Sequence, residues 1–249
     1  MRNMTFGDDG MPAADAAWGW VTAQRWPGWQ VDVLRAGVTR TAPSTAQPRR
    51  WAPKSCEFAR VRHVETANEP VSALTSHAGT DLLLVGAGPM GRLLPASLGR
   101  TVEALMRRSA VPLIIARDGG TVRKVLVCVP DSEQPWHGAH VVTGLPWTGY
   151  ASAVVLTVVS SEDSLAAEGR RVADALSDGG IRAEFRTSVP EPTVAQASPG
   201  HAILSQIDRM RPDLVVVGAP HGPRLASALT GSVAAEVARE ANCPVLLAC

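Results

Sequence analysis

The residues best placed to do chemistry lie between 213 and 232, in the segment DLVVVGAPHGPRLASALTGS. The aliphatic run that ends at Gly218 is typical of a buried strand in a parallel sheet, and Gly231 and Ser232 begin a helical run. The unpaired amides and the positive end of the dipole at such a helix start can bind a phosphate. A serine preceded by glycine at a helix start is also common as a plain cap, so the pattern allows both interpretations.

The elements that must position this turn occur twice along the chain. The segment DLLLVG at 81–86 repeats the pattern of 213–218. Each copy fits the order β-α-β-(loop or helix)-β-α-β-α-β, which indicates an internal duplication into domains 1–119 and 120–249. Helices between strands require parallel sheets with right-handed crossovers. We therefore predict an α/β fold of two tandem, doubly wound, five-stranded parallel sheets, each with strand order 3-2-1-4-5.

In this topology a ligand binds at the carboxyl ends of strands 1 and 4, where the crossovers diverge to opposite faces. Strand 1 of the first copy ends near Asp9, and strand 4 ends at Gly86. The corresponding residues of the second copy are Asp131 and Gly218. We expect each pair to meet at one edge of its sheet.

The 213–232 segment resembles the ATP-loop of the universal stress protein family. In that loop a strand ends in Gly, two residues intervene, a second Gly follows, and Gly-Ser or Gly-Thr comes nine residues later. Gly218, Gly231 and Ser232 are in register, whereas His221 takes the place of the second glycine and Gly222 comes one residue late. The tail at 242–247, NCPVLL, is also similar to the family's last strand.

The resemblance implies a Rossmann-like, adenine nucleotide alpha hydrolase-like fold that binds ATP or AMP, with magnesium arriving only together with the nucleotide. The residues that it assigns to the site are Gly218, His221, Gly222, Gly231, Ser232, Val233, Asp131 and Asp9. In this assignment the glycines and Ser232 hold the phosphates, Val233 adds a backbone N–H, and Asp131 approaches the adenosine. The first copy carries Arg100 in place of the hydroxyl and Pro89 in place of the second glycine, so we expect the nucleotide in the second domain.

Four departures from the family pattern favour an alternative, a nucleotide-free scaffold that acts through dimerisation or by docking a partner. These departures are Arg100, Pro89, Pro130 and His221. The resemblance also implies that the last strands, 112–116 and 245–248, pair antiparallel with each other, so that the two domains associate within one chain. A homodimer is a further expected partner arrangement, since apolar edge strands are seldom left bare.

Composition narrows the remaining function classes. A net charge of +1 gives no support for a nucleic-acid or membrane surface, and no apolar run approaches the roughly 20 residues of a membrane span. The four cysteines lack CxxC spacing, and the His-x-x-His at 137–140 lacks a third ligand, so we expect no metal cluster. No catalytic constellation stands out, so we expect at most weak ATP hydrolysis. Composition leaves a cytoplasmic protein as the expectation, and the resemblance implies that it is a regulator of the stress response.

Overall fold

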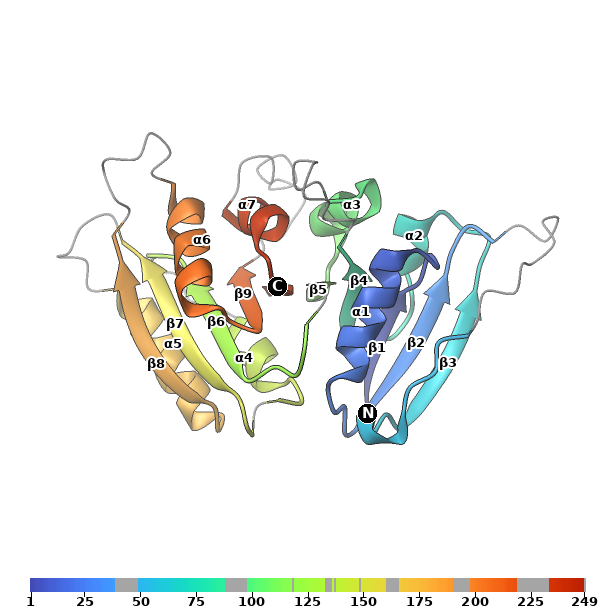
Figure 1. Cartoon of the computed structure of the whole chain (residues 1–249), viewed down its shortest axis with the longest axis horizontal. Coiled ribbons are helices and arrows are strands. Elements are labelled where there is room, and N and C mark those ends of the chain that lie inside the picture. Colours follow the sequence, from blue (N-terminus) through green and yellow to red (C-terminus); the bar gives the residue numbers. More distant parts are fainter. Residues whose placement is uncertain are drawn as a thin grey trace. The chain divides into compact units, whose positions relative to one another are not determined.

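The computed structural model describes residues 1–38, 49–87, 98–117, 119–132, 136, 138–147, 149–159, 166–189, 198–218 and 233–248. Within these residues the chain divides into two compact units, unit 1 (Met1–Gly120) and unit 2 (Thr121–Cys249). Each described unit contains five strands with helices between them (Figure 1). No helix in the described ranges is long and apolar enough to cross a membrane.

Unit 1 alternates strands and helices as the sequence predicts. Its elements are β1 (Arg2–Gly7), α1 (Pro12–Thr22), β2 (Trp29–Arg35), the 3-10 helix η1 (Lys54–Cys56), β3 (Arg60–Glu65), α2 (Pro70–Thr75), β4 (Leu82–Gly86), α3 (Arg100–Arg108) and β5 (Leu113–Ala116). All the pairings among these strands are parallel, and the strand order is β3-β2-β1-β4-β5. The predicted order 3-2-1-4-5 is therefore confirmed in this unit.

Unit 2 repeats the arrangement with helices of different length. Its elements are β6 (Lys124–Val129), α4 (Gly138–Thr143), β7 (Ser152–Val158), α5 (Ala167–Asp178), β8 (Arg182–Ser188), α6 (Pro199–Met210), β9 (Leu214–Gly218), α7 (Val233–Glu240) and β10 (Val245–Ala248). The strands are again parallel, in the order β8-β7-β6-β9-β10. In Figure 1, α6 and α7 lie in front of these strands and α5 lies behind them.

The two faces of each sheet are covered by different helices. In unit 1, a Cβ on Gly7 would meet Leu74 of α2, whereas a Cβ on Gly86 would meet the backbone of Ala13 and Ala14 in α1. Gly7 is in register with Val85, so these two glycines point to opposite faces of the sheet. The central strands β4 and β9 are buried along their aliphatic residues, as expected for strands covered on both sides.

The sequence predicts helices over 13–26 and 69–78, and both end earlier in the structure. Helix α1 ends at Thr22 and not near Trp26, because the Trp26 ring is buried, stacks on Phe58 and donates from Nε1 to the carbonyl of Val21 at 2.8 Å. Helix α2 ends at Thr75, and not near Ala78, because the hydroxyls of Thr75 and Ser76 donate back to carbonyls in the preceding turn.

Candidate functional site

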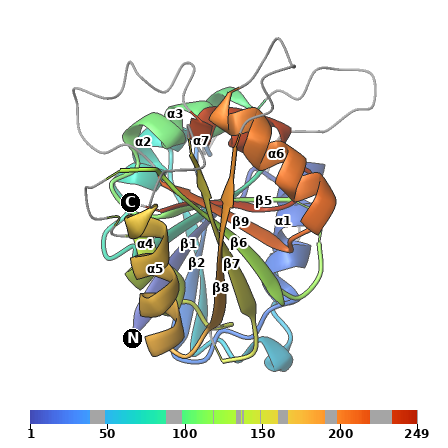
Figure 2. The same ribbon diagram turned by 90° about the vertical axis from the view of Figure 1, so that its left-hand side faces the viewer.

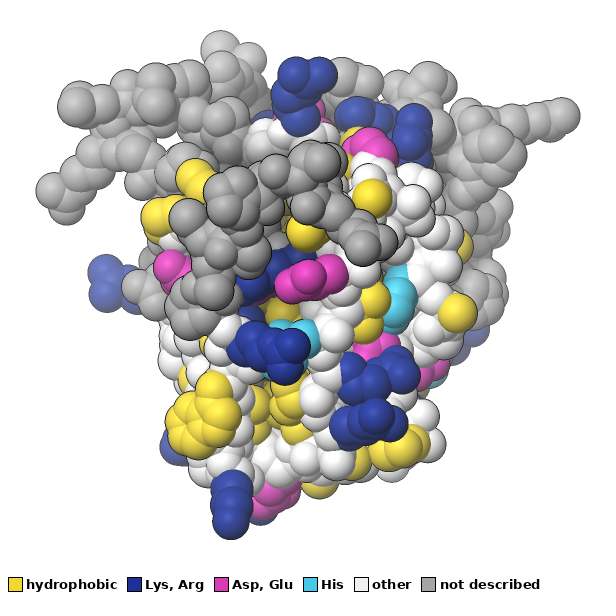
Figure 3. Space-filling model, turned by 90° about the vertical axis from the view of Figure 1, so that its right-hand side faces the viewer, with side chains coloured by type: hydrophobic (Ala, Val, Ile, Leu, Met, Phe, Trp, Pro, Cys, Tyr) yellow, Lys and Arg dark blue, Asp and Glu magenta, His cyan; other side chains and the backbone are white. Residues whose placement is uncertain are grey.

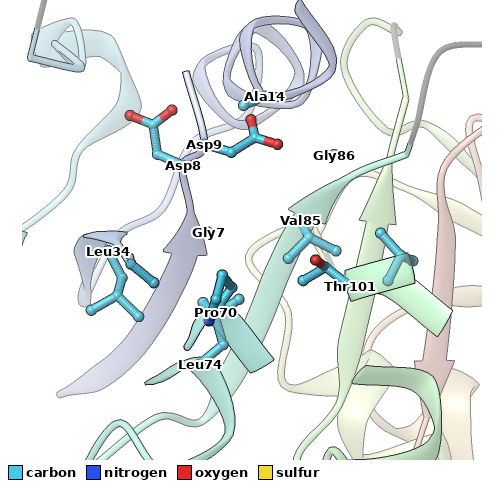
Figure 4. Close-up of a pocket in the computed structure, with 12 residues that line it drawn as sticks. Gly7, Asp8, Asp9, Ala14, Leu34, Pro70, Leu74, Val85, Gly86 and Thr101 are labelled. Atoms are coloured by element: carbon cyan, nitrogen blue, oxygen red, sulfur yellow. The ribbon is translucent and has the colours of Figure 1, made fainter. Parts of the chain in front are cut away.

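A cavity of about 120 Å³ lies at the carboxyl ends of the central strands of unit 1. Its lining comes from β1, β2, β4 and the starts of α1, α2 and α3 (Figure 4). The lining residues are Gly7, Asp8, Asp9, Ala14, Leu34, Ala36, Pro70, Leu74, Val85, Gly86, Thr101 and Val102. This is the edge where the sequence predicts that Asp9 and Gly86 meet, and both border the same cavity.

Asp9 lies at the rim of this cavity with an exposed side chain. Its Oδ1 accepts a hydrogen bond of 2.9 Å from the backbone N–H of Met11, just before α1 begins at Pro12. The carboxylate therefore closes the turn between β1 and α1, as short acidic side chains often do. Its second oxygen has no hydrogen bond within the described residues and remains able to accept one from a ligand hydroxyl or amine.

Asp8 is buried beside Asp9 and is neutralised by two arginines. Arg35 donates from Nη2 to Oδ2 at 2.8 Å, and Arg50 donates from Nη2 to Oδ1 at 2.8 Å. Burial alone would raise the pKa of Asp8, but the hydrogen bonds from Arg50 and Arg35 outweigh it and hold this pKa below its usual value. The sequence analysis missed this cluster. The sequence contains one signal for this cluster, Arg35, which ends the neighbouring strand. Arg50 reaches Asp8 only in the folded chain.

Gly86 has a packing role that explains its identity. A Cβ at this position would lie 2.6 Å from the carbonyl carbon of Ala13 and 3.0 Å from the nitrogen of Ala14. The backbone of α1 can approach β4 only because residue 86 has no side chain. A glycine at the end of this strand is thus required by helix packing, whether or not a phosphate binds nearby.

The corresponding edge of unit 2 differs in its first strand. Cys128 is in register with Val217, as Gly7 is with Val85, so Pro130 stands where Asp9 stands in unit 1. Asp131 follows one residue later, as the sequence predicts, and its side chain is exposed. Any contact between Asp131 and a ligand therefore requires a different turn from that at Asp9.

Gly218 ends β9 and lies against the indole of Trp136. A Cβ on Gly218 would lie 2.8 Å from Trp136 Nε1. The backbone N–H of Trp136 donates to the carboxylate of Glu168, which is buried and also pairs with Arg171. The indole thus occupies the position at Gly218 that the backbone of α1 occupies at Gly86 in unit 1. The many Gly and Pro residues between 130 and 149 predict an irregular segment here, but nothing in the sequence points to Trp136 as the residue that fills this position.

The other predicted site residues of unit 2 fall into two groups. Val233 is the first residue of α7, so its amide lies in the first turn of that helix. His221, Gly222, Gly231 and Ser232 lie outside the described residues. The structure therefore brings Gly218 to a strand end and Val233 to a helix start, and the assignment of the loop between them stays a prediction.

An interaction that the sequence analysis missed joins the starts of α6 and α7. Ser198 caps α6 by accepting a hydrogen bond from the N–H of His201 at 3.0 Å. The same hydroxyl donates to Glu236, with its oxygen 3.0 Å from Oε1 and 3.2 Å from Oε2. The absence of a side chain at Gly200 leaves room for this carboxylate. Glu236 therefore stabilises the positive end of α6.

A second buried carboxylate, Asp32, lies on the face of unit 1 covered by α2. It accepts hydrogen bonds from Arg62 Nε at 2.6 Å, from Asn3 Nδ2 at 3.2 Å, and from His77, whose Nε2 lies 2.9 Å from Oδ2. Burial acts to raise the pKa of Asp32, but the bonds from Arg62, His77 and Asn3 lower it to about 2. Figure 3 views the side of the unit that carries β3, where Lys or Arg, His, and Asp or Glu side chains lie near one another.

An Asp–His pair can position a histidine as a general base. Among the described residues, however, the ring of His77 is hydrogen-bonded to Asp32 alone, and the hydroxyl of Thr80 donates to the backbone carbonyl of His77 and not to its ring. We therefore interpret Asp32 and His77 as structural. No group of three or more His, Cys, Asp or Glu residues that could hold a metal ion occurs in the described part of the chain. Three cysteines, Cys56, Cys128 and Cys243, are buried.

Comparison with known proteins places these observations in a family. The model of the universal stress protein family matches residues 121–248. No curated protein matches the sequence. A universal stress protein from Archaeoglobus fulgidus is similar in structure over 99% of this chain and 97% of its own, with a TM-score of 0.71 and 14% identity. A putative universal stress protein from Pseudomonas aeruginosa is similar over 100% of this chain and 93% of its own, with a TM-score of 0.60 and 14% identity.

A universal stress protein solved in complex with cAMP covers 51% of this chain and 95% of its own, with a TM-score of 0.42 and 24% identity. At this TM-score the likeness supports no conclusion about the present chain. The two longer matches show that the fold extends over both units, and the family model covers more than half of the sequence. The chain belongs to the universal stress protein family.

Proposed function

We propose that this universal stress protein is a cytoplasmic regulator that binds an adenine nucleotide, ATP or AMP, at the carboxyl edge of unit 2. The observation that supports this most is the start of α7 at Val233, directly after Gly231 and Ser232. A helix that follows β9 in this topology begins at the edge where β9 ends, and the amides of a helix's first turn can bind a phosphate. Gly218, at the end of β9, lies on that edge.

In this proposal the glycine-rich loop and Ser232 hold the phosphates, and the N–H of Val233 adds a donor. Asp131 approaches the adenosine, and magnesium enters only with the nucleotide. The cavity beside Asp9 shows that the same edge is hollowed in the sister unit. We expect no more than weak hydrolysis of bound ATP. We also propose that 1–119 and 120–249 are separate folding domains, whereas their pairing through the last strands stays a prediction.

Titration calorimetry with ATP, AMP and cAMP tests this proposal. We expect at least one dissociation constant below about 1 mM, which corresponds to roughly 4 kcal/mol. Replacing Ser232 by Ala removes a hydrogen bond to a charged phosphate and should weaken ATP binding by about 1–2 kcal/mol. A control hydroxyl in unit 1 is Thr101, one residue after the Arg100 that corresponds to Ser232, and Thr101→Ala should leave the affinity unchanged. If Thr101→Ala weakens binding and Ser232→Ala does not, the nucleotide binds in unit 1.

A second candidate function is a nucleotide-free scaffold that acts through dimerisation or partner docking, and one contact favours it. The indole of Trp136 lies against Gly218, at the strand end that a nucleotide would approach. The cavity of about 120 Å³ in unit 1 is also smaller than the roughly 300 Å³ or more of common ligand pockets. The same titration separates the two candidates, because the scaffold should bind none of the three nucleotides.

A further inference from the structure

Strand β8 forms one edge of the sheet of unit 2. It pairs in parallel with β7 along all seven of its residues, and no other described strand lies on its outer side. In Figure 2 it runs between α5 and α6, with its length facing the viewer. An edge of this kind leaves a row of backbone N–H and C=O groups that can pair with another strand. Seven residues is more than the average strand length of about 5–6, so this edge offers an extended template.

The charges of β8 are complementary to those of a second β8 running in the opposite direction. When two copies pair antiparallel about Phe185, Glu184 of each lies directly opposite Arg186 of the other. Arg182 then lies opposite Ser188, and Ala183 lies opposite Thr187. Opposite charges in directly facing positions stabilise an antiparallel pair. Within one chain Glu184 and Arg186 already pair, with Arg186 Nε 2.9 Å from Oε1, and both are more than half exposed.

Neighbouring registers lack this complementarity. If the centre of the pairing moves by one residue in one direction, Glu184 of one copy faces Glu184 of the other. If it moves in the other direction, Arg186 faces Arg186. Like charges in facing positions destabilise the pair. The sequence RAEFRTS therefore favours one self-pairing register, centred on Phe185.

The side chain at the centre of this register lies beside an open groove. Phe185 is half-buried, and the guanidinium of Arg170 lies 4.9 Å from its ring centroid. A groove of about 280 Å³ runs between α5 and β8 here, lined by Arg170, Ala173, Asp174, Ser177, Ala183 and Phe185. Small residues on both elements leave this space open, and a second phenylalanine that arrives opposite Phe185 would enter on the same face of the sheet.

We propose that β8 is a self-association surface, through which two copies of this chain pair antiparallel about Phe185 to form a two-fold symmetric dimer. Such an interface is isologous, since the same strand contributes from both copies. The dimer is independent of nucleotide binding, and it uses a different edge from the last strands β5 and β10. The competing explanation for the charges is that they protect a bare edge from pairing, which is a common use of charged residues on edge strands.

A charge swap separates these two explanations. We expect the wild-type chain to dimerise in light scattering after gel filtration at several concentrations. Glu184→Arg places like charges opposite each other at two symmetric positions and should raise the dimer dissociation constant by about tenfold or more. The double variant Glu184→Arg with Arg186→Glu regenerates both pairs and should restore the dimer. Asp208→Arg, an exposed charge reversal on α6, should have no effect.

Disulfide cross-linking tests the register with two variants on one strand face. In Phe185→Cys the two introduced thiols face each other, with Cα atoms about 4.5–5.5 Å apart, which suits a disulfide. In Ala183→Cys they are offset by four residues, roughly 13 Å, which is too far to bridge. We expect oxidation to link the first variant and not the second, and the parent chain controls for the native cysteines.

Four results would overturn the proposal. The first is a wild-type chain that stays monomeric at every concentration, which supports the protective role of the charges. The second is a dimer that Glu184→Arg leaves intact, which places the interface elsewhere. The third is a charge-swapped double variant that stays as weakened as the single one. Cross-linking at position 183 but not at 185 would show a different register and would equally contradict it.

Discussion

Replacing Gly86 by Ala tests whether the edge of unit 1 is built by close packing of α1 on β4. The new Cβ would lie 2.6 Å from the carbonyl carbon of Ala13, whereas ordinary van der Waals contacts begin near 3.4 Å. The backbone of α1 or β4 must therefore move by about 1 Å. Because the obstacle is backbone and not a flexible side chain, we expect a loss of about 1–3 kcal/mol in the free energy of unfolding.

The same substitution on the contacting helix serves as the control. Gly19 lies on the exposed side of α1, and a Cβ there would meet nothing within 4 Å. Gly19→Ala should stabilise the protein by about 0.5–1 kcal/mol, since glycine weakens a helix interior. Urea unfolding followed by tryptophan fluorescence measures both effects, because Trp18, Trp20 and three further tryptophans lie in unit 1 and two lie in unit 2. The reasoning is refuted if Gly86→Ala is neutral or stabilising, as Gly19→Ala is expected to be.

Two further predictions concern the buried carboxylate and a helix cap. The pKa of Asp32 is lowered from 3.8 to about 2, so its ion pairs contribute about 2 kcal/mol above pH 4, and this contribution is lost as the pH falls through about 2. The destabilisation by Asp32→Asn in urea unfolding should therefore be large at pH 5 and shrink towards pH 2; an equal effect at both pH values would contradict it. Ser198→Ala removes the cap of α6 and the partner of Glu236, and should cost about 1 kcal/mol. Hydrogen exchange should accelerate at the N–H of His201, and unchanged exchange there would argue against the cap.

The arrangement of the strands could be predicted because its signals are local. Aliphatic runs such as 82–85 and 214–217 identify the buried strands, and the glycine after each marks where the strand ends. Helical segments between them require parallel pairing, so the strand order followed without any knowledge of contacts. The ends of α1 and α2 were harder to predict from the sequence, because they depend on where Trp26 packs and on how Ser76 bonds to the preceding turn.

The candidate site was only partly predictable, for the same reason. Asp9 follows a strand, and the structure places it at the carboxyl edge, where it borders the cavity, whereas its role in binding stays a prediction. The neutralisation of Asp8 needs Arg50, which is far away in the sequence and approaches only in the folded chain. The contact of Trp136 with Gly218 is equally non-local, because the two residues are far apart in the sequence.

The most direct test of nucleotide binding is native mass spectrometry of the purified chain, before and after incubation with ATP at about 1 mM. We predict a mass increase of one adenine nucleotide per chain, carried over from the cells or gained on incubation, and a reduced increase in Ser232→Ala. A chain that shows the mass of the bare polypeptide under both conditions would contradict the nucleotide-binding proposal.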